Sequence, residues 1–475
     1  MSDGFTRQLA VFAAGGAERL ITPGILEEST LALLDTVAGT FAGGAGEAVS
    51  RLEDSLDACA SFSCPSPWSG RTYAPGDAAL LYGMASHMDD YDDVSMLAVC
   101  HPSAPVVCAL TAAVTGGVVA GDVGGERFLR ALAIGTEVTI RLGQAMGFRH
   151  YALGFHATST LGVVGAAAAV GRLAGLDERR MSHGLAIAAS SAGGVRKNFG
   201  SHVKPLHVGL AAAAGLRAAR MAACGVQGSS EPFAEGGYLA AYSGGETDRP
   251  AAAPALGAPF AIAEPGFERK RYPCCYMLHK TIEATLALRR ERQLDLSRLR
   301  RAHVLLPQGG TKPLIHPFPG SGLHGKFSAP YAVLASLQDG RIDFTSFTDA
   351  AVARDGIQAR LRDVIVKETD AVPPAGIDLG RLPVMVTLEL NDGSTVEREV
   401  VASPGSREDP LTPDQLRRKW VDCLAHGLQG HIATGASEEL FVEGMRLATL
   451  AHSGKWLRGL LTAGRAGSGG ALEER

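Results

Sequence analysis

A run of cationic and titratable side chains lies between two runs of small apolar residues in the segment from Gly193 to Gly215. A charge in apolar surroundings costs free energy unless it meets a partner, so we expect Lys204 to pair with a carboxylate of the protein or of a ligand. In the alternative interpretation, the segment is a loop between two helices whose lysines and arginines point into water. The side chains concerned are Arg196, Lys197, His202, Lys204 and His207.

Length, charge and hydropathy exclude several classes of protein. A chain of 475 residues suggests two domains, or one large domain and one small. The formal net charge of −4 lacks the basic excess of nucleic-acid binders, so we expect no nucleic-acid partner. The longest uncharged run, residues 102–121, contains Pro105 and several glycines, which favours a buried helix over a membrane span. We therefore expect no membrane partner.

The eight cysteines indicate a reducing compartment. They are scattered without the spacing of a disulfide framework or a metal site, and we recognise no signal peptide. We therefore expect a cytoplasmic protein. Cys274 and Cys275 are adjacent, which suits neither an ordinary disulfide nor the Cys-x-x-Cys spacing of a zinc site.

The hydrophobic periodicity predicts two kinds of structure along the chain. Apolar residues at helical spacing dominate up to about Gly266, and alternating apolar residues then predict strands, the last two joined by a turn over residues 391–394. Thr412 is a good N-cap where helices resume, and Thr158 or Ser159 can cap an earlier helix. The predicted helices cover residues 18–39, 51–60, 78–88, 102–121, 127–146, 158–173, 181–191, 207–223, 328–337, 347–352 and 438–461, and the predicted strands cover residues 304–307, 363–367, 383–390 and 395–402.

This pattern predicts a mainly α fold: a large all-helical domain plus a smaller α+β domain inserted into it. We expect the first part of the helical domain at residues 1–268, the α+β domain at 269–405 and the returning helical segment at 406–462. The tail, residues 463–475, is rich in glycine and should be disordered.

The segment from His87 to Val94 contains four aspartates within five residues. Like charges so close together repel one another, so the aspartates must be solvated or matched by cations. We expect Asp89, Asp92 and Asp93 to be structural, pairing with arginine or capping backbone N–H groups. Farther along the chain, His156 lies just before a helix N-terminus, a position that favours bound anions.

Five ordered segments together resemble the MmgE/PrpD family, whose known members include 2-methylcitrate dehydratase, cis-aconitate decarboxylase and iminodisuccinate epimerase. The resemblance spans about residues 20–440. It implies a helical domain closed by an α+β lid, a homodimer, and neither a metal nor an organic cofactor. The segments are His87 to Pro102, Gly154 to His156, Lys204 to Gly209, Lys270 to Cys275 with His279, and Phe327 to Tyr331 with Asp339-Gly340.

The resemblance also implies site residues, matched motif by motif. In chemical terms, lysines neutralise the carboxylates of a small polycarboxylate, and histidines exchange protons near neutral pH. The predicted catalytic residues are Asp90, His101, His156 and Lys204. The predicted substrate-binding residues are Lys270, Tyr331, Cys275, His207 and Arg196.

We predict an acid–base enzyme that removes a proton beside a carboxylate of a small di- or tricarboxylic acid. We favour a 2-methylcitrate dehydratase-like hydro-lyase, with an iminodisuccinate-type epimerase as the alternative, because both reactions begin with the same proton abstraction. Either His101 or His156 could be the base. We favour cis-aconitate decarboxylation less, because Cys275 stands where decarboxylase members carry histidine and Val94 stands in place of a threonine.

Two other classes of function stay open. The aspartate run also fits the Asp-Asp-x-x-Asp pattern that holds magnesium in helical prenyl-transferring enzymes, but such enzymes need a second acidic cluster, which we do not find in the sequence. A non-catalytic family member that binds a carboxylate without turnover is the other possibility. The presence of His101, His156 and Lys204 argues against that possibility.

Overall fold

A computed structural model describes residues 4–246, 256–369 and 379–465 of the chain. Its contacts divide the chain into two units, of which the first comprises Met1–Lys197, Lys204–Phe267 and Thr412–Arg475. The second comprises Asn198–Val203 and Glu268–Leu411. The predicted fold class, a large helical domain with a smaller α+β domain, is confirmed. The exact domain limits stay predictions, and most of the predicted disordered tail lies outside the described residues.

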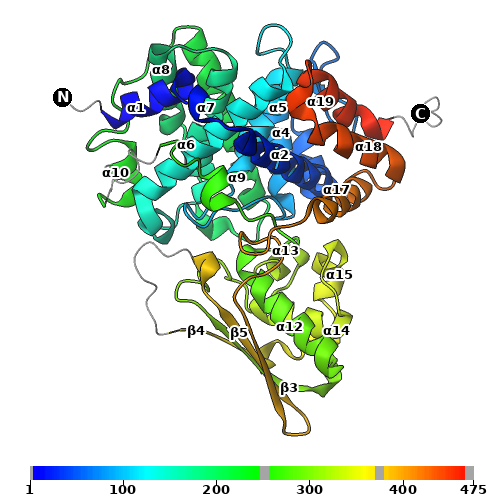
Figure 1. The fold of residues 1–475 in the computed structure, drawn as a ribbon. Coiled ribbons are helices and arrows are strands. Elements are labelled where there is room, and N and C mark those ends of the chain that lie inside the picture. Colours follow the sequence, from blue (N-terminus) through cyan, green and yellow to red (C-terminus); the bar gives the residue numbers. More distant parts are fainter. Residues whose placement is uncertain (1–3, 247–255, 370–378, 466–475) are drawn as a thin grey trace. The chain divides into compact units, whose positions relative to one another are not determined.

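The first unit is a bundle of helices with one very short strand pair, β1 and β2 (Figure 1). Its helices are α1 (Phe5–Val11), α2 (Pro23–Gly43), α3 (Glu47–Asp54), α4 (Pro75–Met88), α5 (Ser103–Thr115), α6 (Gly125–Ala152), α7 (Ala157–Leu173), α8 (Glu178–Ser190), α9 (Val203–Ala223), α10 (Tyr238–Ser243), α17 (Pro413–Gly427), α18 (Thr434–Met445) and α19 (Ser453–Thr462), and its strands are β1 (Cys64–Pro65) and β2 (Thr72–Tyr73).

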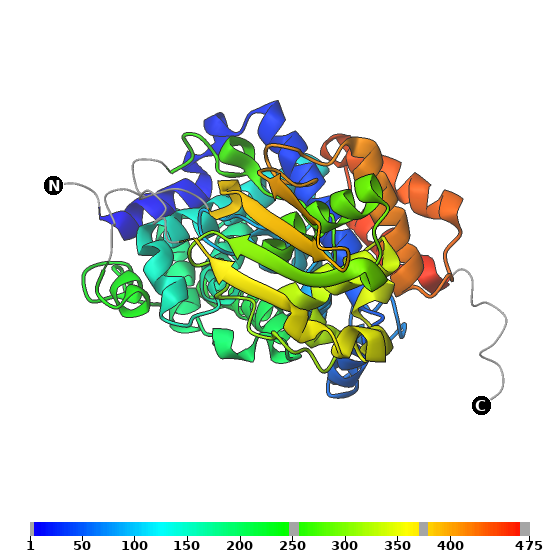
Figure 2. The same cartoon turned by 90° about the horizontal axis from the view of Figure 1, so that it is seen from below.

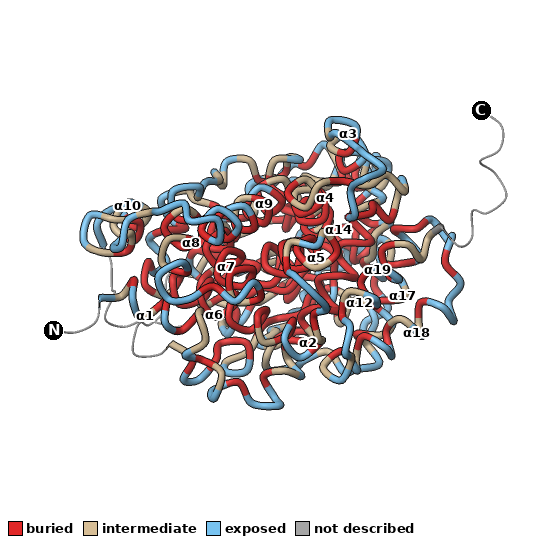
Figure 3. Tube along the Cα trace, turned by 90° about the horizontal axis from the view of Figure 1, so that it is seen from above, coloured by how far each residue is buried: buried red, intermediate tan, exposed pale blue. Residues whose placement is uncertain are grey.

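Small residues let the central helices of this unit pack backbone against backbone. A Cβ atom on Gly165 of α7 would lie 2.6 Å from the carbonyl oxygen of Gly135 in α6, closer than real Cβ atoms approach. Figure 3 shows α5 and α7 as almost wholly buried, and every residue of α7 except Arg172 is buried. The predicted buried helix within residues 102–121 is therefore confirmed as α5, which ends at Thr115 because two glycines follow. No helix in the described part of the chain is long and apolar enough to cross a membrane.

The structure corrects several predicted helix limits. Helix α3 ends at Asp54, so the predicted helix at residues 51–60 was wrong over its second half. The predicted continuous helix at 438–461 is two helices, α18 and α19, separated by a short 3₁₀ turn at Leu447–Thr449. Helix α9 begins at Val203 rather than His207, so Lys204 lies in the first turn of a helix and not in a loop.

The second unit is a four-stranded sheet covered on one face by helices. The strand order is β4-β3-β5-β6, with β3 and β4 parallel and the other neighbours antiparallel. Figure 2 shows the strands side by side, and α12 and α14 lie against the sheet. All four predicted strands and the hairpin turn are confirmed. The elements are α12 (His279–Arg292), β3 (Leu299–Leu306), α13 (Gly322–Gly325), α14 (Ala329–Asp339), α15 (Asp349–Val352), α16 (Asp355–Gln358), β4 (Val364–Glu368), β5 (Val384–Leu390) and β6 (Thr395–Val400).

Candidate active site

The helical unit brings the four predicted catalytic side chains into one buried cluster. Asp90 follows the C-terminal end of α4, His101 precedes α5, and His156 is the residue just before α7. Lys204 lies in the first turn of α9. Each of the four is buried. The ends of four helices therefore meet at one point in the interior.

Asp90 is held in place by a left-handed backbone and by a lysine. Its φ is 51°, a conformation that non-glycine residues rarely adopt, and its backbone N–H donates to the carbonyl of His87 at 3.1 Å. The Lys204 ammonium donates to Asp90 Oδ2 at 2.8 Å, and both side chains are only 5% exposed. The expectation that Lys204 meets a carboxylate in an apolar setting is confirmed, and the alternative of a solvated loop lysine is wrong.

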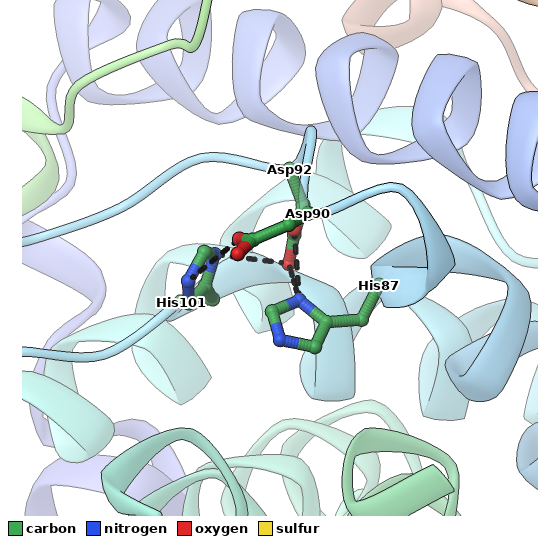
Figure 4. Close-up of side chains that lie close together, drawn as sticks. All are labelled: His87, Asp90, Asp92 and His101. Atoms are coloured by element: carbon green, nitrogen blue, oxygen red, sulfur yellow. Dashed lines mark hydrogen bonds and ion pairs between the residues drawn. The ribbon is translucent and has the colours of Figure 1, made fainter. Parts of the chain in front are cut away.

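His101 contacts two carboxylates, those of Asp90 and Asp92, as Figure 4 shows. Its Nε2 is 3.5 Å from Asp90 Oδ1, and its Nδ1 is 3.2 Å from Asp92 Oδ2. The backbone N–H of His101 donates to Thr158 Oγ1, so Thr158 orients the site instead of capping α7, contrary to the sequence prediction. Each ring nitrogen of His101 therefore faces a carboxylate.

His87 and Asp92 also belong to the cluster, although the sequence prediction gave neither a chemical role. His87 Nδ1 lies 2.9 Å from both oxygens of Asp92, and its ring packs edge-on against His101 with centroids 4.4 Å apart (Figure 4). Burial lowers the pKa of His87 to about 3, although the negative charge of Asp92 acts to raise it. The ring is therefore neutral near pH 7. Burial acts to raise the pKa of Asp92, but the neighbouring His101 and His87 hold it well below its usual range.

The third histidine of the cluster, His156, contacts a fourth, His207. Its Nδ1 lies 3.1 Å from Nδ1 of His207 on α9. Burial, together with the charge of Lys204, lowers the pKa of His156 well below its ordinary value. A neutral imidazole in this position can accept a proton but has none of the acidity of an imidazolium.

A buried lysine far along the chain supports the aspartate loop from the other side. Lys419 on α17 donates to the backbone carbonyl of Tyr91 at 2.7 Å and to Asp35 Oδ1 on α2 at 2.8 Å. Its ammonium also lies 3.8 Å from the centre of the Tyr91 ring. Asp93 accepts hydrogen bonds from the backbone and hydroxyl of Ser103 at the start of α5, as expected for a structural aspartate.

The cluster has the donor types of a metal site as well as those of an acid–base site. Ligand atoms of His87, Asp90, Asp92 and His101 all lie within 4.8 Å of one another. However, His101 directs its two nitrogens at two different carboxylates, and one ion could bind only one of those nitrogens. The arrangement as it stands fits proton exchange along a chain of alternating imidazoles and carboxylates.

The remaining predicted site residues lie outside this cluster or in the second unit. Arg196 is half-buried and its guanidinium stacks on the ring of Tyr151 at 4.6 Å. Lys270, Cys275 and Tyr331 belong to the second unit and are buried within it. The Tyr331 hydroxyl donates to the carbonyl of Ser346, and burial raises the pKa of Tyr331 to about 12. Their roles toward a substrate stay predictions.

Sequence comparisons agree with this architecture. The sequence model of the MmgE/PrpD N-terminal domain matches residues 7–251, and that of the MmgE/PrpD C-terminal domain matches residues 272–437. Cis-aconitate decarboxylase of Mus musculus is 28% identical over 413 residues, which are 84% of this chain and 82% of the relative. The Homo sapiens enzyme is 28% identical over 417 residues, 84% of this chain and 83% of the relative. A cis-aconitate decarboxylase-like protein of Aspergillus oryzae is 30% identical over 374 residues, 74% of this chain and 76% of the relative.

Proposed function

The chain belongs to the MmgE/PrpD family, and on that premise we propose that it is an acid–base lyase that acts on a small di- or tricarboxylate. The observation that carries the proposal is the neutral, fully buried His156 in the same cluster as the Lys204–Asp90 ion pair. A neutral imidazole can remove a proton from a carbon beside a carboxylate. A nearby ammonium can stabilise the negative charge that then develops on that carboxylate.

Each side chain then has a role in the reaction. His156 accepts the proton, and Lys204 binds the activated carboxylate in exchange for part of its contact with Asp90. His101, held between Asp90 and Asp92, donates a proton to the leaving group. Lys270, Tyr331, Cys275 and Arg196 are proposed to bind the substrate.

Among the possible reactions, we propose loss of water, as in a 2-methylcitrate dehydratase, because the cluster contains a neutral base. Such an elimination needs one base and one acid, and the cluster offers His156 and His101 for these roles. Decarboxylation is the second candidate, because the curated relatives are cis-aconitate decarboxylases. It requires one proton from the enzyme at the carbon that loses carbon dioxide. Epimerisation would use two of the same histidines on opposite faces of one carbon.

Proton NMR in D₂O can separate these reactions. Purified, EDTA-treated protein is incubated with 2-methylcitrate, citrate, cis-aconitate and iminodisuccinate. Loss of the hydroxyl together with a new alkene signal establishes the dehydratase. A product that has lost one carboxylate establishes the decarboxylase. Deuterium exchange with interconversion of stereoisomers establishes the epimerase. Lys204→Ala should reduce the rate by about 10²-fold or more, whereas the exposed Lys455→Ala should not change it.

The same experiment can contradict the proposal. Equal activity of Lys204→Ala and the wild type would exclude the assigned role of Lys204. Activity that appears only when a divalent metal is added back would indicate that His87, Asp90, Asp92 and His101 bind a metal ion. Binding of these acids without turnover would favour the non-catalytic alternative. A cytoplasmic homodimer is proposed as the working form, and light scattering of the purified chain tests the dimer.

A further inference from the structure

We propose that His207 conducts protons between the buried base His156 and solvent in a pocket on the outer side of α9. The proposal rests on the proposed function, because it assumes that His156 exchanges protons with the substrate. It gives His207 a role other than the predicted substrate contact. His207 would act through His156 and would not itself touch the reacting atoms.

The contact between the two rings is one that can carry a proton. Two Nδ1 atoms 3.1 Å apart form a hydrogen bond only when one ring bears the hydrogen and the other offers a lone pair. If His156 carries the hydrogen on Nδ1, its Nε2 is bare and can act as the base, and His207 carries its own hydrogen on Nε2. The pair therefore has a donor or acceptor at both outer ends.

His207 also borders a surface pocket of the helical unit. It lines a pocket of about 410 Å³ together with Ser159, Gly194, Val195, Leu210 and Arg217. Val195 is 53% exposed and Leu210 is 49% exposed, so this part of the lining lies at the surface of the unit. At about 30 Å³ per water molecule, the pocket has room for several waters or for a molecule the size of imidazole. His156, by contrast, is only 2% exposed.

Local structure fixes both rings for this exchange. The backbone N–H of His156 donates to the carbonyl of Gly194, whose φ of 123° turns the chain at the pocket wall. The Ser159 hydroxyl donates to the backbone carbonyl of His207 at 3.0 Å. The α7 and α9 segments that carry the two histidines are thus tied together beside the pocket.

The proton balance can be written for each proposed reaction. In the elimination, His156 Nε2 takes the substrate proton, its Nδ1 hydrogen passes to His207 Nδ1, and the Nε2 hydrogen of His207 leaves to water. In the decarboxylation, the pair starts from the opposite arrangement, with hydrogens on His156 Nε2 and His207 Nδ1. The carbon–carboxylate bond breaks, carbon dioxide leaves, and the electron pair takes the Nε2 hydrogen of His156, while the Nδ1 hydrogen of His207 passes to His156 Nδ1 and His207 Nε2 takes a proton from water. Decarboxylation consumes one proton per turnover, and His207 would replace it from the pocket.

Two substitutions at His207 separate conduction of protons from positioning of His156. In weakly buffered solution, His207→Ala should lower kcat by about 10²-fold with little change in KM, and added imidazole should restore the rate in a saturable way. His207→Gln keeps a hydrogen-bonding partner for His156 but cannot pass a proton, so it should stay slow. His183→Ala, which removes a histidine on α8 outside the cluster, should be active and insensitive to imidazole.

Several outcomes would overturn the relay. Full activity of His207→Gln would assign only positioning to His207, and a folded His207→Ala that imidazole does not rescue would exclude proton transfer through the pocket. A second readout needs no turnover: ¹⁵N NMR of labelled histidines measures exchange of the His156 ring proton with water. Slower exchange in His207→Ala, reversed by imidazole, supports the relay even if no acid is turned over and the proposed function fails. Unchanged exchange contradicts the relay whatever the reaction.

Discussion

Two buried lysines hold the aspartate loop that builds the site. Lys204 binds the Asp90 carboxylate, whereas Lys419 binds the backbone carbonyl of Tyr91 and the carboxylate of Asp35. Lys419 and Asp35 are 1% and 0% exposed, so removal of either one leaves a buried charge without its ion-pair partner. We expect Lys419→Met to lower the free energy of unfolding by about 3–5 kcal/mol, as measured by urea denaturation.

A double variant can separate stability from activity at this residue. Asp35→Leu combined with Lys419→Met removes both buried charges, so most of the lost stability should return. Turnover should stay low, because the hydrogen bond to the Tyr91 carbonyl is still missing and the adjacent Asp90 and Asp92 lose their support. Recovery of both stability and kcat in the double variant would show that Lys419 has no positioning role.

At the scale of elements, the site depends on how closely α4 and α9 approach each other. Gly83 of α4 and Gly209 of α9 meet at the crossing, and a Cβ on Gly209 would lie 2.2 Å from the carbonyl oxygen of Leu80. Gly209→Ala should therefore destabilise the protein by about 1–3 kcal/mol and lower kcat, although alanine is the better helix former. The variant would push α9, which carries Lys204 and His207, away from α4.

A matched control lies in α19. Gly459 is also inside a helix, but an added Cβ there would meet no atom within 4 Å. Gly459→Ala should raise the free energy of unfolding by up to about 1 kcal/mol and leave kcat unchanged. Thermal unfolding and turnover of both variants test the argument, which fails if Gly209→Ala behaves like Gly459→Ala.

Sequence patterns predicted the elements better than the contacts between them. Helices such as α4 and α7 followed from periodicity, and the hairpin of β5 and β6 followed from its turn residues. The break between α18 and α19 was missed, because no proline marks it. The close approach of particular glycines also could not be read from the sequence, because it depends on how two helices cross.

The same limit applies to the site. Motifs spread over more than a hundred residues pointed to Asp90, His101, His156 and Lys204, and the structure brings these four together. The role of Asp92 was missed, because the aspartate run was interpreted by its repulsion. The left-handed backbone of Asp90 turns Asp92 toward His87, and sequence spacing does not reveal that turn. Lys419 lies 328 residues from Tyr91, beyond the reach of any local pattern.

For the whole molecule, the buried histidines set how stability depends on pH. His87 and His156 have pKa values far below the ordinary value of 6.5 in the folded state, chiefly because of burial. Unfolding exposes both rings, so below pH 6.5 the unfolded chain binds protons that the folded chain does not. Their contribution to stability is complete above pH 6.5 and is lost as the pH falls toward their folded-state values.

We therefore expect the free energy of unfolding to fall steeply as the pH is lowered from about 6.5 to about 4. Each fully buried neutral histidine should reduce the free energy of unfolding by about 1.4 kcal/mol per pH unit in this window, so the two together give about 3 kcal/mol per unit. Asp92 does not add to the slope here, because its lowered pKa matters only below the ordinary aspartate range near 3.8. Urea denaturation at pH 7.0, 6.0 and 5.0 measures the slope. His87→Gln should reduce this slope by about 1.4 kcal/mol per pH unit, the share of one histidine, even if the variant is less stable at every pH. A slope that is already flat in the wild type would mean that water reaches these histidines in the folded protein.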